Sequence, residues 1–125
     1  MMRFKSDLVE VMLAVADGKL DQMDIRWDRR PAISVIAASK GYPGSYPTGF
    51  PISGIDNCGA TVFHAGTRTG PQGLETAGGR VLGVTQTGGD LALAIACAYA
   101  AASKIHFEGM HYRTDIGRKG LLRYA

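Results

Sequence analysis

The chain has 125 residues, 46% of them hydrophobic, which suits one domain with a single core. Its net charge of +3 is small, and the basic surplus lies mainly from Arg80 onward, so the chain lacks the clustered basic surface that nucleic-acid binding needs. No apolar run reaches the roughly 18 residues of a membrane helix, and the two cysteines, Cys58 and Cys97, are far apart and lack CxxC spacing. These features predict a soluble, reduced, cytoplasmic protein.

The first predicted element is a helix in residues 6–18, SDLVEVMLAVADG. Ser6 can cap this helix, apolar residues recur at helical spacing, and Gly18 ends it. Residues 17–31 carry several aspartates without the spacing of a calcium-binding loop, so we expect a solvated linker and a short strand there.

Four predicted strands follow, separated by turns rich in glycine. Residues 32–39, AISVIAAS, form a continuous run of β-branched residues and alanine, which predicts a strand buried on both faces. Residues 50–55, 60–66 and 80–88 are the other candidates. Together they predict a compact antiparallel sheet or a small barrel.

A second helix is predicted from Asp90 to Lys104, because strong helix formers follow an acidic first position behind two glycines. The closing residues 110–125 mix aromatic and basic side chains, and we expect them to pack back on the domain or to fray. The predicted fold class is therefore α+β.

One segment, SKGYPGSYPTGFPISG at residues 39–54, concentrates glycine, proline and tyrosine and holds a single charge. Proline fixes φ and glycine permits positive φ, so this composition predicts a shaped loop. We expect a shaped loop rich in tyrosine to face a ligand or a partner.

Two ionisable residues outside this loop are candidates for a binding role. His64 lies at a predicted strand end near a glycine that lets a ligand approach, although a structural histidine is favoured over a catalytic one. Arg80 follows Gly78 and Gly79, and it could bind a phosphate or carboxylate bidentately or pair with an acidic side chain. Both interpretations of Arg80 stay open.

Other reactive groups do not form a recognisable catalytic or metal site. The five-residue spacing of His106 and His111 would not place both rings on one face of a helix. We therefore expect His106, Glu108 and His111 to be surface or packed residues, not metal ligands. The loop serines lie outside any nucleophile-elbow pattern: Ser39, Ser45 and Ser53.

Five motifs occur in order along the chain: RFKSDLVEVMLAVADGKLD, GYPG, VFHAGT, GGRVL and YRTDIG. Their combination, from about Arg3 to Gly117, resembles the carboxyl-terminal part of the glycinamide ribonucleotide synthetase family, the phosphoribosylamine–glycine ligases. The resemblance implies a step of de novo purine synthesis, in which ATP, glycine and 5-phosphoribosylamine give glycinamide ribonucleotide, ADP and phosphate. In that family an ATP-grasp module, with Mg²⁺ held by carboxylates, forms glycyl phosphate. The amine of phosphoribosylamine then attacks the glycyl phosphate.

The family's magnesium-binding segment, Asn-x-Arg-Phe-Gly-Asp-Pro-Glu, comes shortly before the region that here begins at Met1. We therefore expect an isolated terminal domain that binds neither ATP nor magnesium and is inactive alone. Residues 1–28 would be the connecting helix and linker from the ATP-grasp module, and residues 29–125 the C-terminal domain. Its partners would be the N-terminal and ATP-grasp domains of the same enzyme, and we expect the isolated domain to self-associate through exposed apolar surface.

In ATP-grasp relatives the terminal domain is a barrel-sandwich hybrid whose loops close the acyl-acceptor side of the cleft. The resemblance thus implies a small antiparallel sheet of that kind with one helix before it and one near the C-terminus. It also implies a group of substrate-facing residues, none of them catalytic or metal-binding: Lys40, Gly41, Tyr42, Pro43, Gly44, His64 and Arg80.

Alternative functions without catalysis remain open for such a fold, namely a carrier domain or a small-ligand-binding module. A lipoyl or biotinyl carrier needs a modifiable lysine at a hairpin tip between acidic or methionine neighbours, and Lys40 does not match that pattern. A nucleic-acid-binding barrel needs aromatic and basic residues interleaved on its strands, whereas the predicted strands carry mainly valine, isoleucine and alanine.

Overall fold

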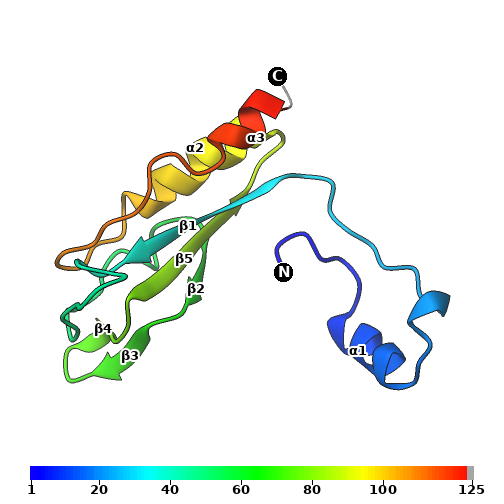
Figure 1. The fold of residues 1–125 in the computed structure, drawn as a ribbon, viewed down its shortest axis with the longest axis horizontal. Coiled ribbons are helices and arrows are strands. Elements are labelled where there is room, and N and C mark those ends of the chain that lie inside the picture. The colour runs from blue at the N-terminus through cyan, green and yellow to red at the C-terminus, as the bar shows by residue number, and fades with distance from the viewer. Residues whose placement is uncertain (124–125) are drawn as a thin grey trace.

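Two small antiparallel sheets and a long helix form the body of the protein in a computed structural model that describes residues 1–123 (Figure 1). The first sheet has the strand order β1-β5-β2, and the second is a hairpin of β3 and β4. The strands are β1 (Ala32–Ala38), β2 (Thr61–His64), β3 (Thr67–Gly70), β4 (Gly73–Thr76) and β5 (Arg80–Thr87). The helices are α1 (Leu8–Ala16), α2 (Leu91–Ala102) and α3 (Arg118–Arg123), with a 3₁₀ turn, η1 (Leu20–Gln22). The predicted α+β class with an antiparallel sheet is confirmed.

Helix α2 covers one face of the three-stranded sheet (Figure 1). Asp90 caps its first turn, because the Asp90 carboxylate accepts a hydrogen bond from the Leu93 N–H at 2.8 Å. Small side chains let the helix approach the strands closely: Ala94, Ala98, Ala101 and Ala102 are all buried. They pack with inward side chains of β1 and β5: Ile33, Val35, Ala37, Leu82 and Val84.

The prediction that the first strand is buried on both faces is wrong. Its residues alternate, with Val35 and Ala37 fully buried while Ser34 and Ile36 are exposed. The physical reason is that α2 covers only one face of the sheet. The opposite face stays open, and this open face carries the candidate site described below.

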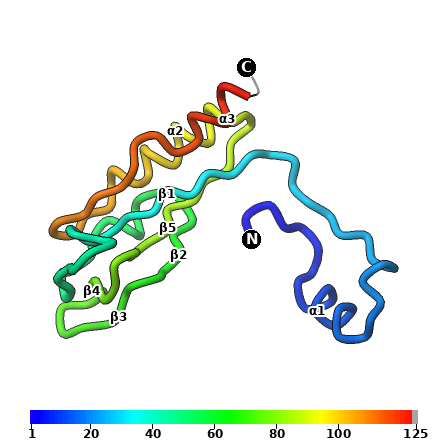
Figure 2. Tube along the Cα trace, in the orientation of Figure 1, coloured from blue at the N-terminus to red at the C-terminus, as the bar shows by residue number. Residues whose placement is uncertain are grey.

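The N-terminal segment, residues 1–28, lies to one side of this body and closes on itself (Figure 2). Phe4 pairs with Trp27 as an isolated bridge, and their rings meet edge to face with centroids 5.2 Å apart. Asp7, not the predicted Ser6, caps α1, because its carboxylate accepts hydrogen bonds from the N–H groups of the first turn. The Ser6 hydroxyl instead accepts a hydrogen bond from the Arg26 N–H at 2.8 Å and so ties the two arms of the segment together.

Two further predictions need correction, and one element was not predicted. Residues 50–55 form only two isolated bridges, because Pro51 has no N–H to donate and Gly54 adopts φ +85°. The β3–β4 hairpin was not predicted, since its strands have four residues each and little hydrophobic patterning. The aspartate-rich stretch contains η1 and only one bridging residue, Trp27, in place of a strand.

The C-terminal tail packs back on α2. For residues 110–125 the sequence predicts either this packing or fraying. The Tyr99 hydroxyl donates to the Arg113 carbonyl at 2.7 Å and accepts from the Ile116 N–H at 3.0 Å, which fixes the tail along the helix. Residues 124 and 125 of the predicted closing segment lie outside the described part of the chain. Both cysteines are free thiols. Within residues 1–123, no helix combines the length and apolar character that crossing a membrane requires.

Candidate functional site

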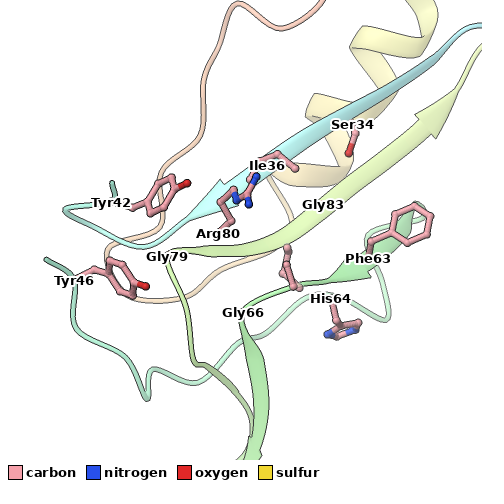
Figure 3. Close-up of a pocket in the computed structure, with 12 residues that line it drawn as sticks. Ser34, Ile36, Tyr42, Tyr46, Phe63, His64, Gly66, Gly79, Arg80 and Gly83 are labelled. Atoms are coloured by element: carbon pink, nitrogen blue, oxygen red, sulfur yellow. The ribbon is translucent and has the colours of Figure 1, made fainter. Parts of the chain in front are cut away.

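A cleft of about 530 Å³ lies over the open face of the three-stranded sheet, where β1 leads into the glycine- and tyrosine-rich loop (Figure 3). Strand residues form its floor, and loop residues close one end. Its lining consists of Ser34, Ile36, Tyr42, Tyr46, Phe63, His64, Ala65, Gly66, Gly79, Arg80, Leu82 and Gly83. None of these twelve described residues carries a carboxylate, so the cleft favours neutral or anionic ligands over cations.

A β-bulge in β5 directs Arg80 into this cleft. Ala37 pairs with Leu82 but Ala38 pairs with Arg80, so Val81 is an extra residue in the strand. Strict alternation would place Arg80 on the face of Leu82, against α2. The extra residue instead sets Arg80 opposite Ala38, on the open face that Ile36 also occupies. Figure 3 shows the Arg80 side chain leaning along the sheet toward Ile36.

Two tyrosines form the closed end of the cleft above Gly79. The rings of Tyr42 and Tyr46 lie with centroids 6.2 Å apart (Figure 3). A Cβ at Gly79 would collide with the Tyr42 ring and lie 2.9 Å from Tyr46 Cε1, so only glycine lets the tyrosines approach the strand this closely. Ser39, which is 2% exposed, anchors the loop through its N–H to the Gly79 carbonyl and its hydroxyl to the Gly78 carbonyl, both at 2.8 Å.

The middle and far end of the cleft differ in polarity. In the middle, Gly83 of the central strand pairs with Ile36 on one side and Phe63 on the other, and both of these side chains are 43% exposed. At the far end the Thr85 hydroxyl donates to the Ser34 hydroxyl at 2.8 Å. The floor therefore runs from a cation, across an apolar strip, to a pair of hydroxyls.

Arg80 is the one cationic side chain of the cleft lining that is charged at every physiological pH. Within residues 1–123, no carboxylate lies within ion-pairing distance of its guanidinium, whereas Arg30, Arg68 and Arg113 each pair with an acidic residue. Of the two interpretations of Arg80 from the sequence, the ligand-binding one is favoured by this geometry.

The structure brings three of the predicted site residues, Tyr42, His64 and Arg80, to the cleft. His64 lies at its edge with the ring turned away from Arg80, and its Nδ1 lies 3.1 Å from the Thr67 hydroxyl (Figure 3). This contact supports the structural reading of His64.

The other four predicted residues belong to the loop without lining the cleft: Lys40, Gly41, Pro43 and Gly44. Lys40 packs against Gly109 at the end of β1. Gly41 has φ +94°, and a Cβ there would collide with the Ser45 carbonyl oxygen, so Gly41 shapes the loop. The peptide bond between Tyr42 and Pro43 is cis.

Sequence reasoning missed most of the cleft floor, including Ser34, Ile36 and Phe63. Their side chains come together only through the strand register, which no local pattern specifies. Tyr46 could have been found, because it lies in the same tyrosine-rich loop as Tyr42. Among residues 1–123, no group of three or more histidine, cysteine, aspartate or glutamate side chains could hold a metal ion.

Residues 32–119 match the family model described as phosphoribosylglycinamide synthetase, C domain. The phosphoribosylamine–glycine ligases of Allochromatium vinosum and Vibrio cholerae are each 46% identical over 98% of this chain and 29% of their own length. A bifunctional purine biosynthetic protein of Dictyostelium discoideum is 44% identical over 94% of the chain and 15% of its own length. The chain thus spans less than a third of these relatives.

A solved structure is also similar in fold. The crystal structure of a phosphoribosylamine–glycine ligase from Thermotoga maritima matches with a TM-score of 0.76 and 34% identity, over 86% of this chain and 26% of that protein. The family model, which matches residues 32–119, includes the three-stranded sheet and the loop that build the cleft. The chain belongs to the phosphoribosylglycinamide synthetase C-domain family.

Proposed function

We propose that this chain is the C-terminal domain of an enzyme that joins glycine to 5-phosphoribosylamine with ATP, in de novo purine synthesis. The observation that carries the proposal is the 46% identity to phosphoribosylamine–glycine ligases over 98% of the chain. The reaction transfers the γ-phosphoryl group of ATP to the glycine carboxylate. The amine of phosphoribosylamine then attacks the acyl carbon of glycyl phosphate, and phosphate leaves.

The role of this domain in that reaction is to complete the phosphoribosylamine side of the site. The cleft supports this role, because Arg80 has no acidic partner within residues 1–123 and is free to bind an anionic group. Tyr42 and Tyr46 close one end of the cleft and would shield the substrate from water.

ATP and magnesium belong to other parts of the enzyme in this proposal. Magnesium neutralises charge on the transferred phosphoryl group and is held by carboxylates, and the residues lining this cleft do not fit it because none is a carboxylate. We accordingly assign residues 1–28 as a connector to the ATP-grasp module and residues 29–125 as the C-terminal domain. The family match from residue 32 and the self-closing N-terminal segment support this division. Two free thiols fit a reducing compartment, so we propose the cytoplasm as the location.

A carrier function has no comparable support. The tip of the β3–β4 hairpin holds Pro71 and Gln72, with no lysine to modify, and Lys40 lies at the end of β1 against Gly109.

The test is a chimera in which this 125-residue chain replaces the aligned segment of the Allochromatium vinosum ligase. We expect the chimera to form glycinamide ribonucleotide from ATP, glycine and phosphoribosylamine. The same ligase without the segment, and the 125-residue chain alone, are expected to form none. A folded chimera without product formation would contradict the proposed function, and product formed by the chain alone would contradict the assignment of ATP and magnesium to other parts.

A further inference from the structure

The cleft has two polar ends of different chemistry. At one end lie the Arg80 guanidinium and the two tyrosine hydroxyls, and at the other lies the hydroxyl of Ser34, which accepts a hydrogen bond from Thr85 (Figure 3). Because the Ser34 oxygen accepts that hydrogen bond, its own O–H is left to donate to a ligand. One end therefore offers a charged guanidinium together with hydroxyl groups, and the other end offers a neutral hydroxyl that can donate.

The distance between the two ends follows from the strand register. The paired residues Ala38 and Arg80 are separated from the pair Ser34 and Thr85 by four residues of β1, which is about 13 Å along the strand. The guanidinium leans from its own row toward Ile36, so the space that a ligand must bridge is shorter than this (Figure 3). A single amino acid would contact only one end.

The middle of the cleft suits a ring with an apolar face. Ile36 and Phe63 stand on either side of Gly83, which has no side chain. Both side chains are partly exposed to the cleft, so they can cover the C–H face of a small ring without hydrogen-bonding to it.

We propose that the cleft binds a phosphorylated pentose lengthwise, with its phosphate on Arg80 and its ring hydroxyls toward Ser34. This inference rests on the proposed function, since it names how the phosphoribosylamine would lie. Arg80 offers a planar fork that matches phosphate oxygens, and the tyrosine hydroxyls can donate to the same group. The reverse orientation would place a dianion beside two neutral hydroxyls and leave the guanidinium without a partner.

The orientation also says where the reacting amine lies. The anomeric carbon of a pentose 5-phosphate is across the ring from the phosphate, so its amine would point away from Arg80. A second hollow of about 370 Å³ adjoins the cleft there and shares Ser34 and Phe63 with it. Trp27 and Arg3 of the N-terminal segment border this hollow, through which the activated acyl group would approach.

The test measures binding to the 125-residue chain by NMR titration with four probes: ribose 5-phosphate, ribose, inorganic phosphate and glycine. Arg80→Ala is expected to weaken ribose 5-phosphate and inorganic phosphate alike, by about tenfold or more. Ser34→Ala is expected to weaken ribose 5-phosphate by about two- to tenfold and to leave inorganic phosphate unchanged. The matched controls are Arg123→Ala and Ser103→Ala, two exposed residues outside the cleft lining, which should change neither affinity.

Several outcomes would overturn the inference. These are no binding of ribose 5-phosphate by the unaltered chain, binding no tighter than that of inorganic phosphate, or equal effects of Ser34→Ala on the two probes. Saturable glycine binding that competes at Arg80 would also overturn it. The chimera separates the two proposals, because product formation with a flat binding profile retains the function and rejects the orientation. The predicted binding profile without product formation would retain the orientation and reject the proposed function.

Discussion

At the scale of single residues, the two glycines of the GYPG loop have different structural requirements. Gly41 has φ +94°, and a Cβ there would collide with the Ser45 carbonyl, whereas a Cβ at Gly44 would lie 3.2 Å from the Gly41 carbonyl oxygen. We expect Gly41→Ala to destabilise the chain by about 1–3 kcal/mol, because it strains the backbone. Gly44→Ala should cost less than about 1 kcal/mol. Urea unfolding of both variants checks the difference, and equal losses would contradict it.

A second prediction at this scale concerns the guanidinium of Arg80. Arg80→Lys keeps the charge but loses the planar fork, so in the chimeric ligase the KM for phosphoribosylamine should rise by an amount equivalent to about 1–3 kcal/mol. Steady-state kinetics measure this effect, with Arg123→Lys as the control on α3. An unchanged KM would remove Arg80 from the substrate site.

At the scale of elements, Asp28 lies at the centre of the contacts that close the N-terminal segment. The Arg30 side chain donates to both carboxylate oxygens of Asp28, and Arg30 N–H and Lys5 add to this. These contacts hold the pKa of Asp28 well below its usual range. A carboxylate with a lowered pKa stabilises the folded state above its unfolded pKa of about 3.9, and this contribution is lost as the pH falls toward the folded value.

We therefore expect the segment to loosen below about pH 4. Trp27, the chain's one tryptophan, packs on Phe4 and reports this change in its fluorescence. Asp28→Asn should show the loosened emission at neutral pH and no acid transition. Asp115→Asn is the control, because Asp115 also has a lowered pKa but pairs with Arg113 in the C-terminal tail. An acid transition in Trp27 emission that survives Asp28→Asn would reject this account.

The elements also show how far the sequence could predict the fold. Local composition located α1, α2, β1, β2 and β5, because apolar spacing and β-branched runs are properties of adjacent residues. Tyr42 and Arg80 were predicted for the same reason, from the glycines and prolines beside them. Ile36 and Phe63 were not predicted as site residues, because they meet only through pairing with β5, and β1 was wrongly expected to be buried on both faces. Which face a helix covers is set by distant segments.

At the scale of the whole molecule, α1 presents an apolar surface to solvent. Val9, Met12 and Leu13 are 64%, 62% and 61% exposed, although the helix is well capped. Contiguous exposed apolar patches mark interaction surfaces. In the proposed enzyme that partner would be the ATP-grasp module, and in the isolated chain a second copy would replace it.

The corresponding prediction is that the 125-residue chain self-associates with rising concentration. Leu13→Glu should abolish this association without lowering the free energy of unfolding by more than about 0.5 kcal/mol, because the side chain is exposed. Leu122→Glu, which alters an exposed leucine on α3, should leave association unchanged. Sedimentation velocity measures both variants. A chain that stays monomeric at every concentration, or one that Leu122→Glu dissociates equally, would contradict a role for α1.

The extra residue in β5 has a consequence for how such a cleft is inherited. Inserting one residue between Ala37 and Ala38 would give Val81 a partner, restore regular pairing and turn Arg80 toward the face that α2 covers. A one-residue insertion in β1 would thus remove the cation from the cleft while leaving Arg80 in the chain. Strand length and residue identity must therefore be retained together during evolution. An arginine at this column of an alignment is informative only in chains whose first strand has gained no residue opposite Val81.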